Sequence, residues 1–139
     1  MGSDDLQEFA MSDFSGMTSL NPGYRALVLG ASGGIGGAFV AAIKADPACG
    51  SVVELSRSRD GFDITDEASV NALADTAIAQ LGAIDIAINA TGWGLLKGLH
   101  EITEEELDQI IALQLKGVHY FLSAFVRAMP HGGSLVQIS

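Results

Sequence analysis

A glycine-rich turn constrains the fold of this chain more than any other feature of its sequence. Residues 30–37 read Gly-Ala-Ser-Gly-Gly-Ile-Gly-Gly and follow a short apolar run at 25–29, which is typical of a buried strand. Apolar residues then recur with helical spacing over 35–45, until Asp46 and Pro47 end the pattern. This order is typical of a parallel sheet, in which the turn lies at the carboxyl edge, where such sheets bind ligands.

Strands and helices continue to alternate along the chain. Apolar runs at 52–56 and 84–88 predict two further strands, and the segment 62–64 (Phe-Asp-Ile) predicts a very short one. A helix is predicted from Asp66, its N-cap, to Gly82, its C-terminal stop. We therefore expect an α/β fold, a doubly wound parallel sheet with helices on both faces.

The clearest helix start lies at Thr103. Thr103 and Glu106 have the spacing of a capping box, and Ile102 and Leu107 occupy hydrophobic-staple positions. The helix is expected to end at Pro130. Its apolar face, which fits either the core or an interface, contains Leu107, Ile110, Ile111, Leu115, Val118, Phe121, Leu122 and Phe125.

The two ends of the chain differ from the middle. Residues 1–22 carry four acids and no Lys or Arg, and are expected to form a flexible acidic tail. Residues 23–139 are expected to form one domain. The last residues, 132–139, read as a turn and a strand without the helix that normally follows a buried parallel strand. We therefore expect a domain that is truncated on its C-terminal side.

Composition narrows the classes of function. Seventeen acidic and seven basic residues give a formal net charge of −10, which argues against nucleic acid or an anionic membrane surface as partners. No apolar run approaches the ~20 residues of a membrane span, and residues 1–22 lack the basic start of a signal peptide, so a cytoplasmic protein is expected. The single cysteine, Cys49, excludes an internal disulfide and a cysteine zinc cluster, and no metal site is predicted.

The glycines have the spacing G-x-x-x-G-x-G, at Gly30, Gly34 and Gly36. This spacing differs from G-x-G-x-x-G, the common dinucleotide-binding fingerprint. It is not a P-loop either, because no Gly-Lys-Ser/Thr follows. Glycines at such a turn allow the tight bend, the approach of the backbone to a pyrophosphate and the close packing of the helix on the sheet. The helix start then presents free N–H groups to phosphate.

Three motifs together carry a resemblance to a known family. The glycine turn matches T-G-x-x-x-G-x-G, except that Leu29 replaces the threonine. Residues 89–92, Asn-Ala-Thr-Gly, match N-N-A-G in two of its four letters. Asp63, within 62–65, matches an aspartate that contacts adenine. With these motifs at fitting spacings, the segment 25–139 resembles the N-terminal, cofactor-binding part of the short-chain dehydrogenases/reductases.

The resemblance implies a Rossmann-like, NAD(P)-binding domain that is incomplete at its C-terminal side. It also implies the residues that contact the cofactor. These are Gly30, Ser32, Gly34, Ile35 and Gly36 at the pyrophosphate, Arg57 at a 2′-phosphate, Asp63 and Ile64 at the adenine, and Asn89 and Ala90 along the ribose.

The end of the second strand bears on the choice between NAD and NADP. A carboxylate that binds the ribose 2′-OH of NAD usually lies about 20 residues past the glycines, but Ser56 stands there and Arg57 follows. A hydroxyl and a guanidinium suit a 2′-phosphate, so NADP is expected, with NAD possible. Glu54 shares a strand face with Ser56 and would oppose a phosphate. The alternative for Arg57 is a solvated surface charge.

The catalytic residues implied by the resemblance are incomplete here. Similar enzymes use a Tyr-x-x-x-Lys pair as general acid/base, a serine at the substrate oxygen and an asparagine that supports a water relay. This sequence contains no Tyr-x-x-x-Lys, and the family serine would fall one position beyond Ser139. Gln114 stands at the asparagine position. Trp93 fits two roles equally, a substrate-pocket lining or a cover of the core edge.

We therefore expect hydride transfer between NADP(H) and a small-molecule carbonyl or alcohol, carried out by a longer parent protein, with the 139-residue chain itself inactive. The alternative is a non-catalytic nucleotide-binding or interaction module. A methyltransferase-type fold is disfavoured, because it would place an acid where Ser56 stands. The resemblance also implies a homo-oligomer with the long helix at the interface.

Overall fold

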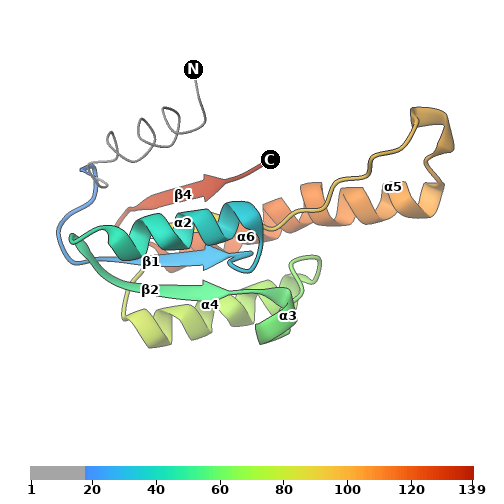
Figure 1. Ribbon diagram of the computed structural model, residues 1–139. Coiled ribbons are helices and arrows are strands. Elements are labelled where there is room, and N and C mark those ends of the chain that lie inside the picture. Colours follow the sequence, from blue (N-terminus) through green and yellow to red (C-terminus); the bar gives the residue numbers. More distant parts are fainter. Residues whose placement is uncertain (1–17) are drawn as a thin grey trace, which may run out of the picture.

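The computed structural model describes residues 18–139, and most of the predicted acidic tail, residues 1–17, lies outside the described residues. The four strands form one parallel sheet in the order β2-β1-β3-β4 (Figure 1), as the predicted α/β fold requires. Their bounds are β1 (Tyr24–Leu29), β2 (Cys49–Leu55), β3 (Ile86–Asn89) and β4 (Ser134–Gln137).

Helices cover both faces of the sheet, and Figure 1 shows α2 and α4 on opposite sides of it. Successive side chains of β1 point to opposite faces: Val28 packs towards α2, whereas Leu27 and Leu29 pack towards α4 and α6. The helical elements are α2 (Gly34–Ala45), α3 (Arg57–Asp60), α4 (Glu67–Leu81), η1 (Leu99–Glu101), α5 (Glu104–Ile111), the π-helical turn η2 (Ala112–Lys116) and α6 (Gly117–Ala128).

The helix caps predicted from the sequence are confirmed. Asp66 accepts a hydrogen bond from the backbone N–H of Ala68 at the start of α4, and Gly82 ends that helix with a positive φ of 78°. Thr103 and Glu106 form the expected capping box, with bonds of 3.2 and 3.0 Å between each side chain and the other residue's backbone N–H. These local signals fix where both helices begin.

The predicted short strand at 62–64 is wrong, because these residues have no regular structure. Phe62 and Ile64 are buried in the core cluster beneath α4 and α6, while Asp63 between them stays exposed. The alternating burial imitates a strand, although the segment instead turns from α3 into α4 after Gly61, whose φ is 69°. This loop packs against the long helix, since a Cβ on Gly117 would lie 3.1 Å from the Ile64 carbonyl oxygen.

The predicted single long helix consists of α5, the π turn η2 and α6, and its predicted apolar face divides in two. Phe121 and Phe125 are buried in the core. Leu107, Leu115 and Leu122 are exposed on the other side. A π turn advances the following residues around the helix axis, so one regular stripe cannot stay on one face across it. In Figure 1, α5 extends beyond the carboxyl ends of the strands.

Candidate functional site

The glycine turn holds the carboxyl ends of three strands together. The backbone N–H groups of Gly30 and Ala31 both donate to the Leu55 carbonyl at the end of β2, at 2.8 and 3.1 Å. Gly30 has a φ of 81°, and a Cβ there would lie 2.8 Å from the carbonyl carbon and oxygen of Ala90, which follows β3. Gly30 is therefore required both by its backbone conformation and by this close approach.

Two further glycines in the turn differ in what surrounds them. A Cβ on Gly36 would collide with the Gly30 carbonyl, so Gly36 lets α2 pack against the turn. A Cβ on Gly34 would meet nothing within 4 Å. The N-cap of α2 is Gly33, which offers no side chain to the first N–H groups of the helix. The helix start therefore faces open space with donors that suit an anion.

A cleft of about 1220 Å³ lies beside the glycine turn at the carboxyl edge of the sheet. This is larger than the roughly 300–1,000 Å³ of most small-molecule pockets and leaves room for an extended ligand. Six of the predicted cofactor residues line it, namely Gly30, Ser32, Arg57, Asp63, Ile64 and Ala90. The other four do not: Gly34, Ile35 and Gly36 belong to the first turn of α2, and Asn89 is buried.

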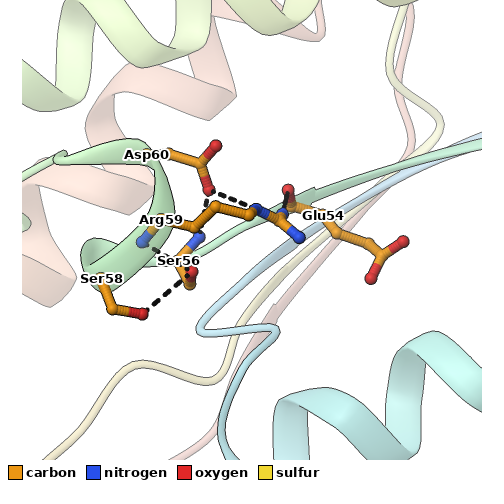
Figure 2. A network of polar contacts seen from close by, with 5 residues as sticks. All are labelled: Glu54, Ser56, Ser58, Arg59 and Asp60. Atoms are coloured by element: carbon orange, nitrogen blue, oxygen red, sulfur yellow. Dashed lines mark hydrogen bonds and ion pairs between the residues drawn. The ribbon is translucent and has the colours of Figure 1, made fainter.

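Figure 2 shows how the turn after β2 is built. Ser56 is only 2% exposed; its hydroxyl accepts from the Arg59 N–H at 3.3 Å and its own N–H donates to Asp60 at 2.8 Å. The Arg59 guanidinium binds Asp60 and the Glu54 carbonyl. Ser56, predicted to meet a phosphate, instead caps α3 and does not line the cleft, whereas Ser58 does.

The two charged residues that bear on phosphate binding face different ways. Arg57 lines the cleft. The Glu54 carboxylate, which was expected to oppose a phosphate, forms an ion pair of 2.5 Å with Lys44 on α2. Lys44 therefore balances the negative charge of Glu54 on the α2 side. Arg57 is the cation beside the end of β2 that borders the cleft.

Asp63 is held in an ionised form. Its Oδ1 accepts from the Thr65 hydroxyl at 2.6 Å and from the Thr65 N–H at 2.9 Å. These bonds, followed by the charge of Arg57, lower the pKa of Asp63 below its ordinary value. Thr65 was not among the predicted site residues, although an aspartate followed two residues later by a threonine is a turn signal that could have indicated it.

Asn89 joins the two strands on the other side of the site. Its Oδ1 accepts from the hydroxyl and the N–H of Thr91 at 2.6 and 3.1 Å, and its Nδ2 donates to Gln137 on β4 at 2.8 Å. The side chain is 1% exposed. Asn89 therefore acts on the site indirectly, by joining β3 to β4. Of the two residues predicted to lie along the ribose, Asn89 and Ala90, only Ala90 borders the cleft.

Gln114 lies in η2, and its Nε2 donates to the Trp93 carbonyl at 3.1 Å. Trp93 lines the cleft and is 44% exposed, which favours the pocket-lining interpretation. Neither tyrosine borders the cleft: Tyr24 is buried at the opposite end of β1, and Tyr120 packs against the core beneath α6. Ala112 and Leu113, which also line the cleft, were missed because the π turn that directs them there has no sequence signal of its own.

Residues 18–139 contain neither a candidate metal site nor a candidate membrane-spanning helix. No three His, Cys, Asp or Glu side chains in this part of the chain are grouped so that they could hold a metal ion. None of its helices has both the length and the apolar character needed to cross a membrane.

Known proteins resemble this chain in sequence. A family model described as enoyl-(acyl carrier protein) reductase matches residues 36–139. D-threitol dehydrogenase of Mycolicibacterium smegmatis is 31% identical over 133 residues, covering 82% of this chain and 51% of its own length. Sorbitol dehydrogenase of Cereibacter sphaeroides is 30% identical over 125 residues, covering 80% and 49%.

Solved structures show the same arrangement. A Thermoplasma acidophilum aldohexose dehydrogenase superposes with a TM-score of 0.71 at 27% identity, covering 89% of this chain and 51% of that one. A Serratia marcescens short-chain dehydrogenase/reductase gives 0.72 at 25% identity, covering 84% and 57%. The chain thus spans about half the length of the relatives that it matches. Because the family model matches most of the chain, relatives at 30–31% identity cover about four-fifths of it and solved members of the family share its fold, this chain belongs to the short-chain dehydrogenase/reductase family.

Proposed function

We propose that residues 23–139 form the NADP-binding part of an oxidoreductase that transfers hydride between NADP(H) and a small-molecule carbonyl or alcohol. The observation that carries this proposal is the cleft at the carboxyl edge, which the glycine turn and Arg57 line together. The names of the relatives, D-threitol and sorbitol dehydrogenase, support a substrate of the alcohol or carbonyl class.

The residues at the cleft fit a nicotinamide dinucleotide. Within residues 18–139 no contact explains a glycine at position 34, where a Cβ would meet none of their atoms within 4 Å, but a phosphate against the start of α2 would. Such a cofactor would supply the hydride donor or acceptor. Around its pyrophosphate we propose the first-turn and loop residues Gly30, Ser32, Gly34, Ile35 and Gly36.

We propose NADP over NAD because of the charges at the end of β2. The Arg57 guanidinium borders the cleft, and the nearest opposing carboxylate on that strand, Glu54, is paired with Lys44. A guanidinium binds phosphate through a fork of donors, and the neighbouring Ser58 replaces Ser56 as the hydroxyl on the cleft. Asp63 and Ile64 would border the adenine, and Ala90 the ribose, with Asn89 holding its strand in place.

The acid/base residues of the reaction are proposed to come from outside these 139 residues. The sequence contains no Tyr-x-x-x-Lys, and neither of its two tyrosines borders the cleft. The 139-residue chain is therefore expected to bind the cofactor without turning over.

Calorimetric titration of the 139-residue chain with NADPH and NADH tests the cofactor proposal, with circular dichroism to establish folding. NADPH should bind more tightly than NADH, and Arg57→Ala should remove most of that preference. Arg127→Ala, which removes an equal charge from α6, is the matched control and should leave both affinities unchanged. A folded chain that binds neither nucleotide would contradict the proposal.

A second candidate is a non-catalytic nucleotide-binding or interaction module. Apolar residues exposed on α5, η2 and α6 fit an interaction surface, with Leu115 and Val126 at 66% and 63% exposure, and the same surface fits a homo-oligomer of the oxidoreductase. We propose that a second copy of the chain covers this face. Sedimentation should then show a dimer that Leu115→Glu converts to a monomer; a monomeric unaltered chain would contradict the pairing. The module alternative is favoured if a longer chain that supplies Tyr-x-x-x-Lys still fails to turn over.

A further inference from the structure

The loop between β3 and η1 is tethered at both ends. Near β3, the Asn89 side chain accepts two hydrogen bonds from Thr91. At the far end, Lys97 forms bonds of 2.8 and 2.9 Å with Glu106 on α5. Between these two points, within residues 92–96, the described residues provide one hydrogen bond, which runs from the Gln114 amide to the Trp93 carbonyl at 3.1 Å.

The packing around this bond is tight. A Cβ on Gly92 would lie 3.3 Å from Gln114 Nε2, so the glycine makes room for the amide. Gln114 itself lies in the π turn. Such turns redirect side chains and are frequent at functional sites. The Gln114 amide is therefore directed at the loop backbone, and one of its two N–H groups is committed to Trp93.

We propose that Gln114 is a positioning residue, which holds the Trp93 carbonyl and thereby sets the place of the Trp93 indole at the mouth of the cleft. This positioning role is separate from the water-relay role that the resemblance implies for an asparagine here, because it acts on the loop backbone. The extra methylene of glutamine provides the reach. The contact of the indole with a bound cofactor or substrate rests on the proposed function, whereas the placing of the loop does not.

Trp93 is the only tryptophan in the sequence, so intrinsic fluorescence reports on this loop alone. In the full 139-residue chain, Gln114→Ala and the isosteric Gln114→Glu, which removes the donor, should shift the emission to longer wavelength and increase quenching by acrylamide. Gln80→Ala on α4, an exposed amide away from the cleft, should change neither.

Unchanged emission and quenching in both folded Gln114 variants would overturn the proposal. A purely structural role would lower the free energy of unfolding without altering the emission of the native state. Should Gln114→Ala fail to fold, Gln114→Glu keeps the side-chain volume and still tests the donor. Lack of NADPH binding by the unaltered chain in calorimetry would overturn the proposed function and leave the fluorescence result to decide the role of Gln114.

A double-mutant cycle gives an independent test. Gly92→Ala should displace the amide and shift the Trp93 emission when Gln114 is present. In the Gln114→Ala background the same change should have a smaller effect, because the crowded atom is gone. Equal shifts in both backgrounds would contradict the coupling between the two positions.

Discussion

The hydroxyl of Tyr24, the first residue of β1, donates a 2.8 Å hydrogen bond to Asp46 Oδ2 beyond the end of α2. Asp46 Oδ1 in turn accepts from the Ala48 N–H at 2.9 Å. Both side chains are buried, so the pair fastens the end of α2 to the start of the sheet on the side opposite the cleft. Buried polar groups of this kind are costly to leave without partners.

Replacing Tyr24 with Phe should lower the free energy of unfolding by about 1–3 kcal/mol, because Asp46 loses a donor that water cannot replace in the core. Urea denaturation followed by circular dichroism measures the change. Tyr120→Phe is the matched control, since no hydrogen bond to its hydroxyl is found among the described residues. An equal loss in both variants would mean that the Tyr24–Asp46 bond contributes nothing specific.

Alkaline pH should destabilise the chain through the same residue. Burial, and then the neighbouring Asp46, raise the pKa of Tyr24 above its ordinary value. Above about pH 10 the unfolded tyrosine loses its proton while the folded one keeps it, so the unfolded state binds fewer protons and the free energy of unfolding falls with rising pH. Denaturation curves from pH 8 upwards measure this fall, which should be smaller in Tyr24→Phe.

Two glycines in one turn should respond oppositely to alanine. Gly36→Ala should destabilise the chain by about 1–3 kcal/mol, because its methyl group collides with the Gly30 carbonyl. Gly34→Ala should leave stability unchanged or raise it by up to about 1 kcal/mol, since its methyl group would meet no atom of the described part of the chain within 4 Å. The same variant should nevertheless weaken NADPH binding in calorimetry. Unaltered affinity in Gly34→Ala would remove the phosphate from the start of α2.

The pKa of Asp63 should depend on Thr65. Thr65→Val removes the hydroxyl bond that is the main cause of the lowered pKa, so the pKa should rise towards its ordinary value, as measured by NMR titration of the carboxyl carbon. The low pKa in the folded chain contributes stability that is present above the unfolded pKa and lost as pH falls through the folded one. Thr76→Val on α4 is the control and should not move it.

Local signals predicted much of this fold, because each depends on a few adjacent residues. The capping box at Thr103 and the stop at Gly82 are set by hydrogen bonds within one helical turn. A strand at 62–64 was predicted because buried Phe62 and Ile64 flank the polar Asp63, as in a strand. The connection between β2 and α4 buries both side chains without forming a strand. The π turn has no marker in the sequence, so the division of the long helix into inner and outer faces could not be predicted.

The sequence predicted which residues meet at one edge of the sheet, whereas their contacts with a cofactor stay a prediction. The glycine turn, Arg57 and Asp63 meet at one cleft because the ends of parallel strands share an edge. Which serine borders that cleft depends on the turn at α3. There the Arg59 N–H donates to the Ser56 hydroxyl, and Ser58 is the serine that lines the cleft. Similarly, Asn89 turns inward because Gln137 lies beside it on β4, a pairing that no local pattern reveals.

The close approach of Gly30 to Ala90 also has a mechanical consequence. These residues follow β1 and β3, the two central strands. The turn that borders the cleft therefore also packs the ends of these two strands against each other. A ligand bound at this turn should therefore restrict the motion of β1 and β3 together. Occupancy of the cleft should therefore slow the escape of protons from the deepest amides of the core, and a chain that loses its ligand should loosen from the centre of the sheet outwards.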